Sequence, residues 1–235
     1  MANWKLKLKH SLNKITGKYN HLNTQVNCPK QWYGNEYGGF YVNPDLIQSG
    51  SIVYSFGIGE DISFDLAMMK THQSIVFAFD PTPKSIKWIA KNGPKQDFHF
   101  YDYGIGATTG TTFFHLPKNP DHVSRSTVLQ ENVSETEKVE VLMKSFADIA
   151  EELQHKKIDV LKMDIEGSEY EVLDSILATP VQIMQVLIEF HERFFENGKQ
   201  KTVDFIAKIN AKGYAIFAVS DSFEEISFIL KSELK

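Results

Sequence analysis

Short apolar runs alternate with longer amphipathic stretches along the chain from about residue 50 onward. Most of the runs are continuous Val, Ile, Phe and Leu rather than strict alternations of apolar and polar residues, which is typical of strands covered on both faces. The runs that we predict to be strands are Ser51–Gly57, Ser74–Phe79, Asp97–Tyr103, Ile158–Met163, Ile183–Phe190, Tyr214–Val219 and Glu225–Leu230. Because helical patterns lie between them, we expect parallel β-α-β units and a doubly wound α/β sheet.

The predicted helices have recognisable ends. Thr82 is followed by a proline, which suits an N-cap and the first helical position. Ser168 is followed three residues later by a glutamate, the spacing of a capping box, and Ser145 begins a helix in a similar way. Gly213 is placed to end the helix before the sixth strand.

Two features depart from the alternation of strands and helices. Only residues 221–224 separate the last two strands, which is too short for a helical crossover, so these strands are expected to pair antiparallel at the edge of the sheet. Residues 104–144 form a long, polar insertion, which is expected either to act as a lid or to carry a small hairpin whose strands are Thr111–Leu116 and Lys138–Leu142. The expected fold is a mostly parallel, seven-stranded sheet with an antiparallel strand at its C-terminal edge, within one domain at residues 46–235.

Charge is distributed unevenly along the chain. The net charge is −5, yet residues 1–35 hold six lysines and no acidic residue. We therefore expect residues 1–45 to be a basic leader that packs on or near the body, or that makes a weak contact with an anionic membrane surface. The acidic remainder argues against a nucleic-acid partner.

Cysteine content and hydropathy bear on the compartment. The chain has one cysteine, Cys28, and no apolar run as long as a membrane span or resembling the core of a signal peptide. These features predict a cytoplasmic protein.

A glycine-rich turn follows the first predicted strand. Gly57 and Gly59 are two residues apart, where backbone N–H groups and a close-approach surface can meet a ligand. The second strand ends at Asp80, 21 residues after Gly59, where a carboxylate can accept hydrogen bonds from both hydroxyls of a ribose. The alternative is that Asp80 only caps the following helix. The turn and the acid together favour a cofactor that contains adenosine.

The residues after the turn discriminate between such cofactors. A dinucleotide site requires a third glycine, but Glu60 and Asp61 stand there, and two carboxylates would repel a pyrophosphate. They suit a cofactor with an ammonium and a sulfonium group, which is S-adenosylmethionine. No lysine motif of the kind that binds nucleoside triphosphates is present.

Acidic residues also follow the fourth and fifth strands. Asp164 and Glu166 are two residues apart and therefore on one side of an extended chain, where they could orient a substrate, contact the cation of a cofactor or hold a divalent metal. Their alternative role is to complement the dipole of the next helix. Glu189 and His191 end the neighbouring strand, where His191 is a candidate general base or a structural histidine. No residue is assigned as a metal ligand.

Taken together, these motifs resemble a known family. Residues 164–169, preceded by Leu161 and Lys162, are similar to the signature of the FkbM-family methyltransferases. The turn at residues 54–61, residues 80–82 and residues 188–191 match the family in the same order, so that the resemblance covers about residues 50–192. It implies a Rossmann-like class I methyltransferase fold, S-adenosylmethionine as cofactor, and O-methylation of a hydroxyl on a sugar, a glycan or a small natural product.

The resemblance also implies the contacts of the cofactor. Gly57 and Gly59 are expected to line the cofactor, Asp80 to hold its ribose, and residues 102–104 (Asp102, Tyr103 and Gly104) to border the adenine. Thr82 is also expected to contact the cofactor. Ser55 and Asp61 belong to the same turn, although many members carry an acid and a glycine at these two positions.

The expected reaction places the methionine end of the cofactor between the turn at residues 55–61 and Asp164. His191 would accept the proton of the acceptor hydroxyl, oriented by Glu189 or Glu166. Two alternatives remain open: an NAD-linked oxidoreductase, and a non-catalytic cofactor-binding or scaffold protein anchored by its basic leader.

Overall fold

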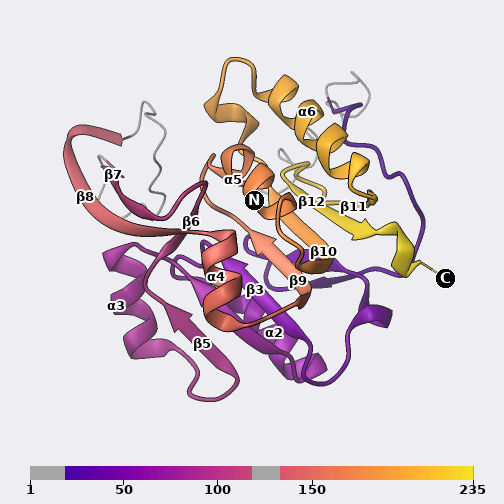
Figure 1. The fold of residues 1–235 in the computed structure, drawn as a ribbon, viewed down its shortest axis with the longest axis horizontal. Coiled ribbons are helices and arrows are strands. Elements are labelled where there is room, and N and C mark those ends of the chain that lie inside the picture. The colour runs from indigo at the N-terminus through magenta and orange to yellow at the C-terminus, as the bar shows by residue number, and fades with distance from the viewer. Residues whose placement is uncertain (1–18, 118–132, 235) are drawn as a thin grey trace, which may run out of the picture.

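The computed structural model describes residues 19–117 and 133–234, which form an α/β sandwich around a central sheet (Figure 1). The sheet has seven strands in the order β11-β12-β10-β9-β3-β4-β5. They are β3 (Ile52–Phe56), β4 (Ile75–Phe79), β5 (Phe98–Tyr101), β9 (Lys157–Met163), β10 (Gln182–Glu189), β11 (Tyr214–Val219) and β12 (Glu225–Leu230). All neighbours pair parallel except β12, which is antiparallel to both β10 and β11. The predicted fold class is thus confirmed, with β11 outermost in the C-terminal pair.

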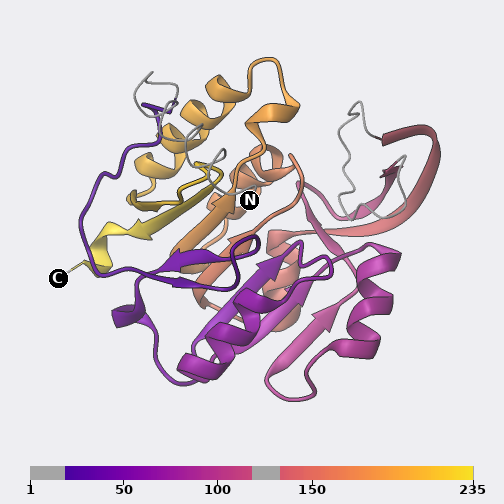
Figure 2. The same cartoon turned by 180° about the vertical axis from the view of Figure 1, so that it is seen from behind.

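Helices cover both faces of this sheet (Figures 1 and 2). On one face lie α4 (Phe146–Leu153), α5 (Glu169–Leu177) and α6 (Gly198–Ala211), and on the other lie α2 (Ser63–His72) and α3 (Pro83–Asn92). Successive residues of the strands face opposite sides, so Val53 packs with α2 while Tyr54 packs with α4. Because both faces are buried, the strands need the continuous apolar runs seen in the sequence.

The helix caps agree with the sequence at two places and differ at a third. The side chains of Thr82 and Ser145 each accept a hydrogen bond at the start of α3 and α4, as predicted. The capping box predicted at Ser168 does not form, since Ser168 makes no side-chain cap at α5. The carboxylate of Glu169 instead accepts hydrogen bonds from the backbone N–H groups of Ile165 and Gly167. The turn before α5 is therefore held by the side chain of Glu169, the first residue of the helix, rather than by Ser168.

Residues 19–45 pack on the domain rather than standing apart from it. They contain the hairpin β1 (Gln31–Tyr33) and β2 (Phe40–Val42) and a 3-10 helix, η1 (Pro44–Leu46). Phe40 and Val42 are buried under α2. Five of the six lysines of the predicted leader lie at residues 1–18, outside the described residues, so its contact with a membrane surface stays a prediction.

The insertion forms a small second sheet in the order β6-β8-β7, made of β6 (Gly104–Gly106), β7 (Gly110–Pro117) and β8 (Val133–Ser145). The antiparallel pairing of β7 with β8 confirms the predicted hairpin, although β8 extends further than expected. Figures 1 and 2 show this hairpin projecting at one side of the molecule, beside the end of the main sheet that carries β4 and β5.

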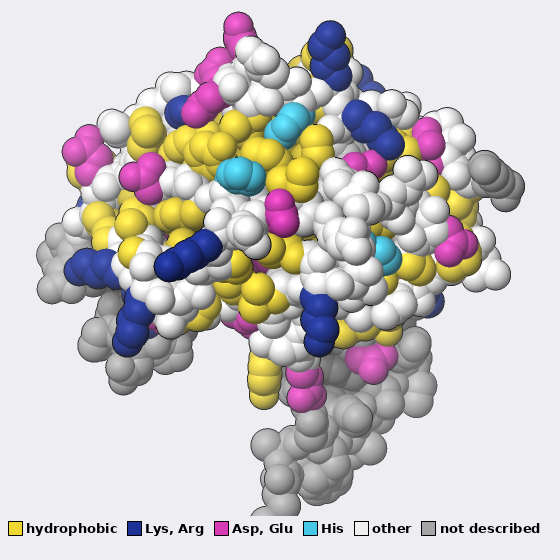
Figure 3. Space-filling view, turned by 90° about the horizontal axis from the view of Figure 1, so that it is seen from below, with side chains coloured by type: hydrophobic (Ala, Val, Ile, Leu, Met, Phe, Trp, Pro, Cys, Tyr) yellow, Lys and Arg dark blue, Asp and Glu magenta, His cyan; other side chains and the backbone are white. Residues whose placement is uncertain are grey.

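Short 3-10 helices follow two strands, η2 (Glu192–Phe194) after β10 and η3 (Lys231–Glu233) after β12. In the described part of the chain no helix has the length and apolar character needed to cross a membrane. On the face in Figure 3, basic and acidic side chains are interspersed among apolar ones. That face does not offer the broad basic surface that nucleic-acid binding requires.

Candidate active site

A cavity of about 350 Å³ lies where β3, β4 and β9 end. Its volume is in the range of sites for small molecules. Residues of the glycine turn, the end of β4 and the segment after β9 line it, and Phe114 and Met143 of the insertion close one side. In an open α/β sheet, the carboxyl ends of the strands are where ligands bind.

Gly57 brings the first turn into direct contact with the segment after β9. Its φ is +73°, and a Cβ added there would lie 1.7 Å from the carbonyl oxygen of Asp164. The N–H of Gly57 donates to the carbonyl of Phe79, and its own carbonyl accepts from Nζ of Lys162 at 3.0 Å. Only glycine fits this position, because both the backbone conformation and the neighbouring chain exclude a side chain.

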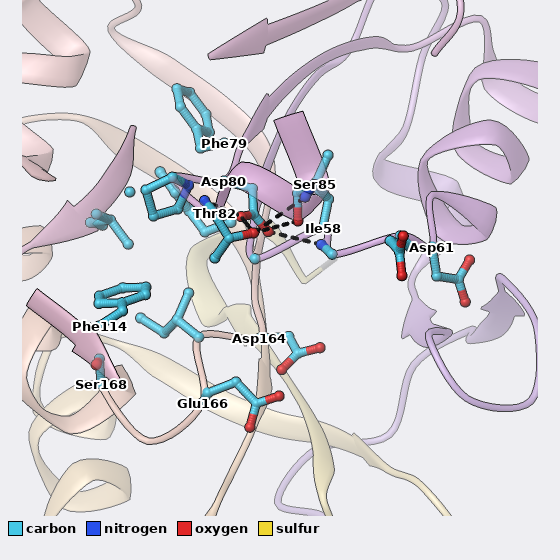
Figure 4. Close-up of a pocket in the computed structure, with 18 of the residues that line it drawn as sticks. Ile58, Asp61, Phe79, Asp80, Thr82, Ser85, Phe114, Asp164, Glu166 and Ser168 are labelled. Atoms are coloured by element: carbon cyan, nitrogen blue, oxygen red, sulfur yellow. Dashed lines mark hydrogen bonds between the residues drawn. The ribbon is translucent and has the colours of Figure 1, made fainter. Parts of the chain in front are cut away.

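Asp80 connects the glycine turn to the start of α3 (Figure 4). Its Oδ2 accepts a hydrogen bond from the N–H of Gly59 at 2.9 Å, and its Oδ1 accepts from the N–H and the hydroxyl of Thr82. Gly59 and Asp80, which the sequence analysis assigned to the same cofactor site, are therefore hydrogen-bonded to each other. Since Oδ2 accepts a single hydrogen bond from the described residues, it has capacity for a hydroxyl of a ligand.

Asp61 lines the cavity but also holds the wall in place. Its carboxylate accepts hydrogen bonds from the side chain of Asn35 and from the N–H of Ser63. It thereby ties the β1–β2 hairpin to the first turn of α2. Among the described residues that line the cavity, the carboxylic acids Glu60, Asp61, Asp80, Asp164 and Glu166 are not accompanied by any Lys or Arg.

Three predicted contact residues lie outside the cavity lining. Ser55 is fully buried on the opposite side of β3 from the cavity-lining Phe56, beside Asp65. Burial raises the pKa of Asp65 to about 6, although the nearby ammonium of Lys162 opposes the shift. Ser55 therefore belongs to a polar cluster beneath the glycine turn rather than to its ligand-facing surface.

The other two follow β5. Asp102 is exposed, and the hydroxyl of Tyr103 donates to Glu152 at 3.4 Å, away from the cavity. Gly104, the last residue of the predicted segment, lines the cavity together with Ile105. The segment therefore reaches the cavity at its end rather than at Asp102 and Tyr103.

The remaining predicted residues form a carboxylate cluster around His191. The Nδ1 atom of His191 lies 2.9 Å from the carboxylate of Glu169. Its Nε2 atom lies 3.4 Å from Glu166, 3.6 Å from Glu189 and 3.8 Å from Asp164. Asp164 and Glu166 line the cavity, whereas Glu189 and His191 stand behind them.

This position argues against the predicted role of His191 as general base. The ring is 1% exposed and does not line the cavity, so it does not reach an acceptor placed there. Burial opposes its charged form, but the hydrogen bond to Glu169 and the surrounding carboxylates outweigh burial and raise the pKa of His191 to about 10. A histidine in that state carries the proton that a general base must accept.

The protonation of Glu189 follows from the same cluster. Burial and the charge of Asp164 raise the pKa of Glu189 to about 9, against the opposing effect of His191. Glu189 is therefore expected to be neutral at pH 7. The two acids that face the cavity are the remaining candidates for contact with an acceptor.

Sequence reasoning missed the residues that reach the cavity from distant segments. Tyr37 and Gly38 come from the β1–β2 hairpin, and Phe114 and Met143 come from the β7–β8 hairpin. Lys162 belongs to the family signature, and its ammonium donates a hydrogen bond to the carbonyl of Gly57. The sequence could have predicted such a contact, because a lysine inside a continuous apolar strand needs a polar partner.

Comparison with known proteins identifies the family. Residues 51–216 match the profile described as methyltransferase FkbM domain. A search of curated proteins found no significant match.

Solved structures with a similar fold include two archaeal fibrillarins. The Methanococcus jannaschii fibrillarin pre-rRNA processing protein is 11% identical with a TM-score of 0.47, over 86% of this chain and 83% of that chain. The Aeropyrum pernix fibrillarin with natively bound S-adenosyl-L-methionine is 10% identical with a TM-score of 0.41, over 89% of this chain and 85% of that chain. Similarities this low support no conclusion about function.

The cavity suits the cofactor of this family. The glycine turn and the end of β4 line one cavity, and Oδ2 of Asp80 has capacity for a ribose hydroxyl. The carboxylates of Asp164 and Glu166 suit a ligand that carries a sulfonium and an ammonium group. The family match extends over more than half of the chain and includes each of these residues. The chain therefore belongs to the FkbM methyltransferase family, and it is an S-adenosylmethionine-dependent methyltransferase.

Proposed function

We propose that this protein methylates a hydroxyl oxygen of an uncharged sugar, glycan or small natural product. The observation that carries the proposal is that Asp164 and Glu166 line the same cavity as the glycine turn and Asp80. Figure 4 places their carboxylates side by side, across the cavity from Asp80. Carboxylates accept hydrogen bonds from hydroxyl groups, so both can hold an acceptor next to the cofactor.

The residues of the cavity align the acceptor hydroxyl with the cofactor and accept the proton of that hydroxyl. When bound, the cofactor provides the electrophilic methyl group. Asp164 or Glu166 accepts a hydrogen bond from the acceptor hydroxyl, which turns a lone pair of its oxygen toward the cofactor side and gives the proton a destination. Phe79, Ile105 and Phe114 form apolar walls that exclude water from this space. Glu189 and His191 act as positioning residues behind the two acids.

The charge of the cavity limits the class of acceptor. Its described lining carries five carboxylic acids and no Lys or Arg. Glu60 pairs with Lys84 at 3.0 Å, just outside this lining, and the other carboxylates would repel a phosphorylated acceptor. The same argument opposes the pyrophosphate of NAD, which disfavours the oxidoreductase alternative. The acceptors that fit this cavity are therefore polyols and sugars without anionic groups.

Calorimetric titration tests the cofactor and a methyl-transfer assay tests the acceptor. We expect S-adenosylhomocysteine to bind one site per chain and NAD not to bind. Incubation with isotopically labelled S-adenosylmethionine should label neutral glycans or small polyols, detected by mass spectrometry, and should not label matched sugar phosphates. Preferential labelling of the phosphates would contradict the proposed acceptor class, and NAD binding without S-adenosylhomocysteine binding would contradict the cofactor.

Tyr37 is expected to contact the acceptor. Its side chain is 83% exposed yet lines the cavity rim, and an exposed aromatic ring can pack on the apolar face of a sugar. Tyr37→Ala should lower kcat/KM for the acceptor by about tenfold, or about 1.4 kcal/mol, while leaving the affinity for S-adenosylhomocysteine within about twofold. Leu66→Ala removes another exposed apolar side chain, outside the cavity lining, and serves as the control. Equal kinetics of both variants would remove Tyr37 from the acceptor site.

A further inference from the structure

We infer that Asp164, Glu166 and His191 form a binding site for one divalent cation at the border of the cavity. One ligand atom from each of the three residues lies within 4.8 Å of the others. The sequence left a divalent metal as one of three possible roles for Asp164 and Glu166 and assigned no metal ligand, and it did not link His191 to these two acids, which follow β9 whereas His191 follows β10. Their meeting depends on the parallel pairing of those strands.

The Nε2 atom of His191 is the central observation. It is buried and has no hydrogen-bond partner among the described residues. Carboxylate oxygens of Glu166 and Asp164 lie 3.4 and 3.8 Å away, within the range of an ion pair but longer than the usual N–H···O hydrogen bond of about 2.7–3.2 Å. Two ligands bound about 2.1 Å from one metal ion stand roughly 3.0–3.4 Å apart. The separation of Nε2 from Glu166 is therefore that of two ligands of one ion, and Asp164 lies close enough to reach the same ion.

The histidine ring is also held in the orientation that a metal ligand needs. Its Nδ1 atom is bound to Glu169, whose carboxylate is fixed by the N–H groups of Ile165 and Gly167. Phe194 stacks on the ring at 4.9 Å between centroids. Metal-bound histidines usually have such a carboxylate or carbonyl at their other nitrogen, which fixes ring orientation and directs the second nitrogen to the ion.

The surroundings supply a further oxygen atom and a path of entry. The carboxyl group of Glu189 places an oxygen 3.6 Å from Nε2. Binding of a cation at Nε2 would displace the proton held there, and the ion would compensate acids that are costly to bury together. The side chains of Asp164 and Glu166 are 28% and 22% exposed, so an ion can enter from the cavity.

The donor set favours a particular class of ion. Carboxylate oxygens suit Mg²⁺ and Mn²⁺, and an imidazole nitrogen shifts the preference toward first-row transition metals. We therefore assign the site to Mn²⁺ or an ion of similar chemistry. If the proposed function holds, the acceptor hydroxyl would bind the ion rather than Asp164 or Glu166 directly, and the ion would lower the pKa of that hydroxyl. Binding of the ion does not depend on that function.

Titration of the full chain with Mn²⁺, followed by loss of the electron paramagnetic resonance signal of free Mn²⁺, tests the site. We expect one Mn²⁺ per chain, and a higher Tm when Mn²⁺ is present. Asp164→Asn and His191→Gln should each weaken binding by tenfold or more, since even outer partners of metal ligands contribute about 10–100-fold. Glu171→Gln, an exposed position in the first turn of α5, removes the same charge and should bind like the natural chain.

Two results would overturn the site. One is the absence of Mn²⁺ binding below millimolar concentration. The other is Mn²⁺ binding by Asp164→Asn equal to that of Glu171→Gln, which is informative even if His191→Gln does not fold. Calorimetry with S-adenosylhomocysteine on the same samples separates the two proposals. Intact cofactor binding without Mn²⁺ binding would refute the metal site alone.

Discussion

Gly57→Ala is expected to destabilise the fold by more than about 4 kcal/mol, a range that single substitutions reach only through a specific defect. The added Cβ would lie 1.7 Å from the carbonyl oxygen of Asp164 and 2.7 Å from its carbonyl carbon. Backbone atoms of a central strand cannot move aside at low cost, because the N–H of Asp164 donates to Phe56 and continues the ladder between β3 and β9. The same displacement would move the acids that face the cavity.

Gly50→Ala is a matched control for this prediction. Gly50 has a φ of +82°, similar to that of Gly57, but a Cβ there would meet no atom within 4 Å. It should therefore cost only the backbone penalty of about 1–2 kcal/mol. Urea unfolding of both variants measures the difference, and the Tm of Gly57→Ala should fall by roughly 10 °C or more. Equal stabilities would show that the ends of β3 and β9 are free to separate, and cofactor binding by Gly57→Ala would then be retained.

The fold could be predicted because its signals are local. Each predicted strand is a short apolar run, and the short 221–224 connection was enough to predict the antiparallel pair at the edge. The link between Gly59 and Asp80 was also predictable, since adjacent parallel strands bring their carboxyl ends together. These inferences needed only the period of the pattern and the lengths of the connections.

The predicted and observed cavity linings differ where two faces of a strand or two distant segments are involved. Ser55 follows Tyr54 and precedes Phe56, so the two-residue period of a strand places it on the opposite face, a signal present in the sequence. By contrast, Phe114 and Tyr37 reach the cavity from separate hairpins, and no local pattern gives the position of a hairpin against the main sheet.

The protonation state of His191 could not be predicted from a local sequence pattern either. It depends on three acids that meet His191 only in three dimensions, namely Glu169, Asp164 and Glu166. The sequence placed His191 at the end of a strand but gave no information on how far it stands from the cavity.

Asp80→Ala is expected to weaken binding of S-adenosylhomocysteine by about 1–3 kcal/mol, the cost of losing a charged hydrogen-bond acceptor. The loss has two origins in this structure. Oδ2 would no longer be available to a ribose hydroxyl, and the N–H groups of Gly59 and Thr82 would lose their acceptor, so the turn that faces the cofactor would lose its anchor. The first is the loss of a direct contact with the ligand, and the second is the loss of a preorganised binding turn.

Asp80→Asn separates these two contributions. Its amide oxygen can replace either Oδ1 or Oδ2, but its NH₂ group would then face a donor, so an affinity between those of the natural chain and Asp80→Ala is expected. Asp204→Ala, at an exposed position of α6 outside the cavity lining, removes one charge and should leave the affinity unchanged. Calorimetric titration gives the affinities, and urea unfolding shows how much of each loss reflects a weakened fold. An Asp80→Ala variant that binds as tightly as Asp204→Ala would show that the carboxylate only anchors the chain and does not hold the ribose.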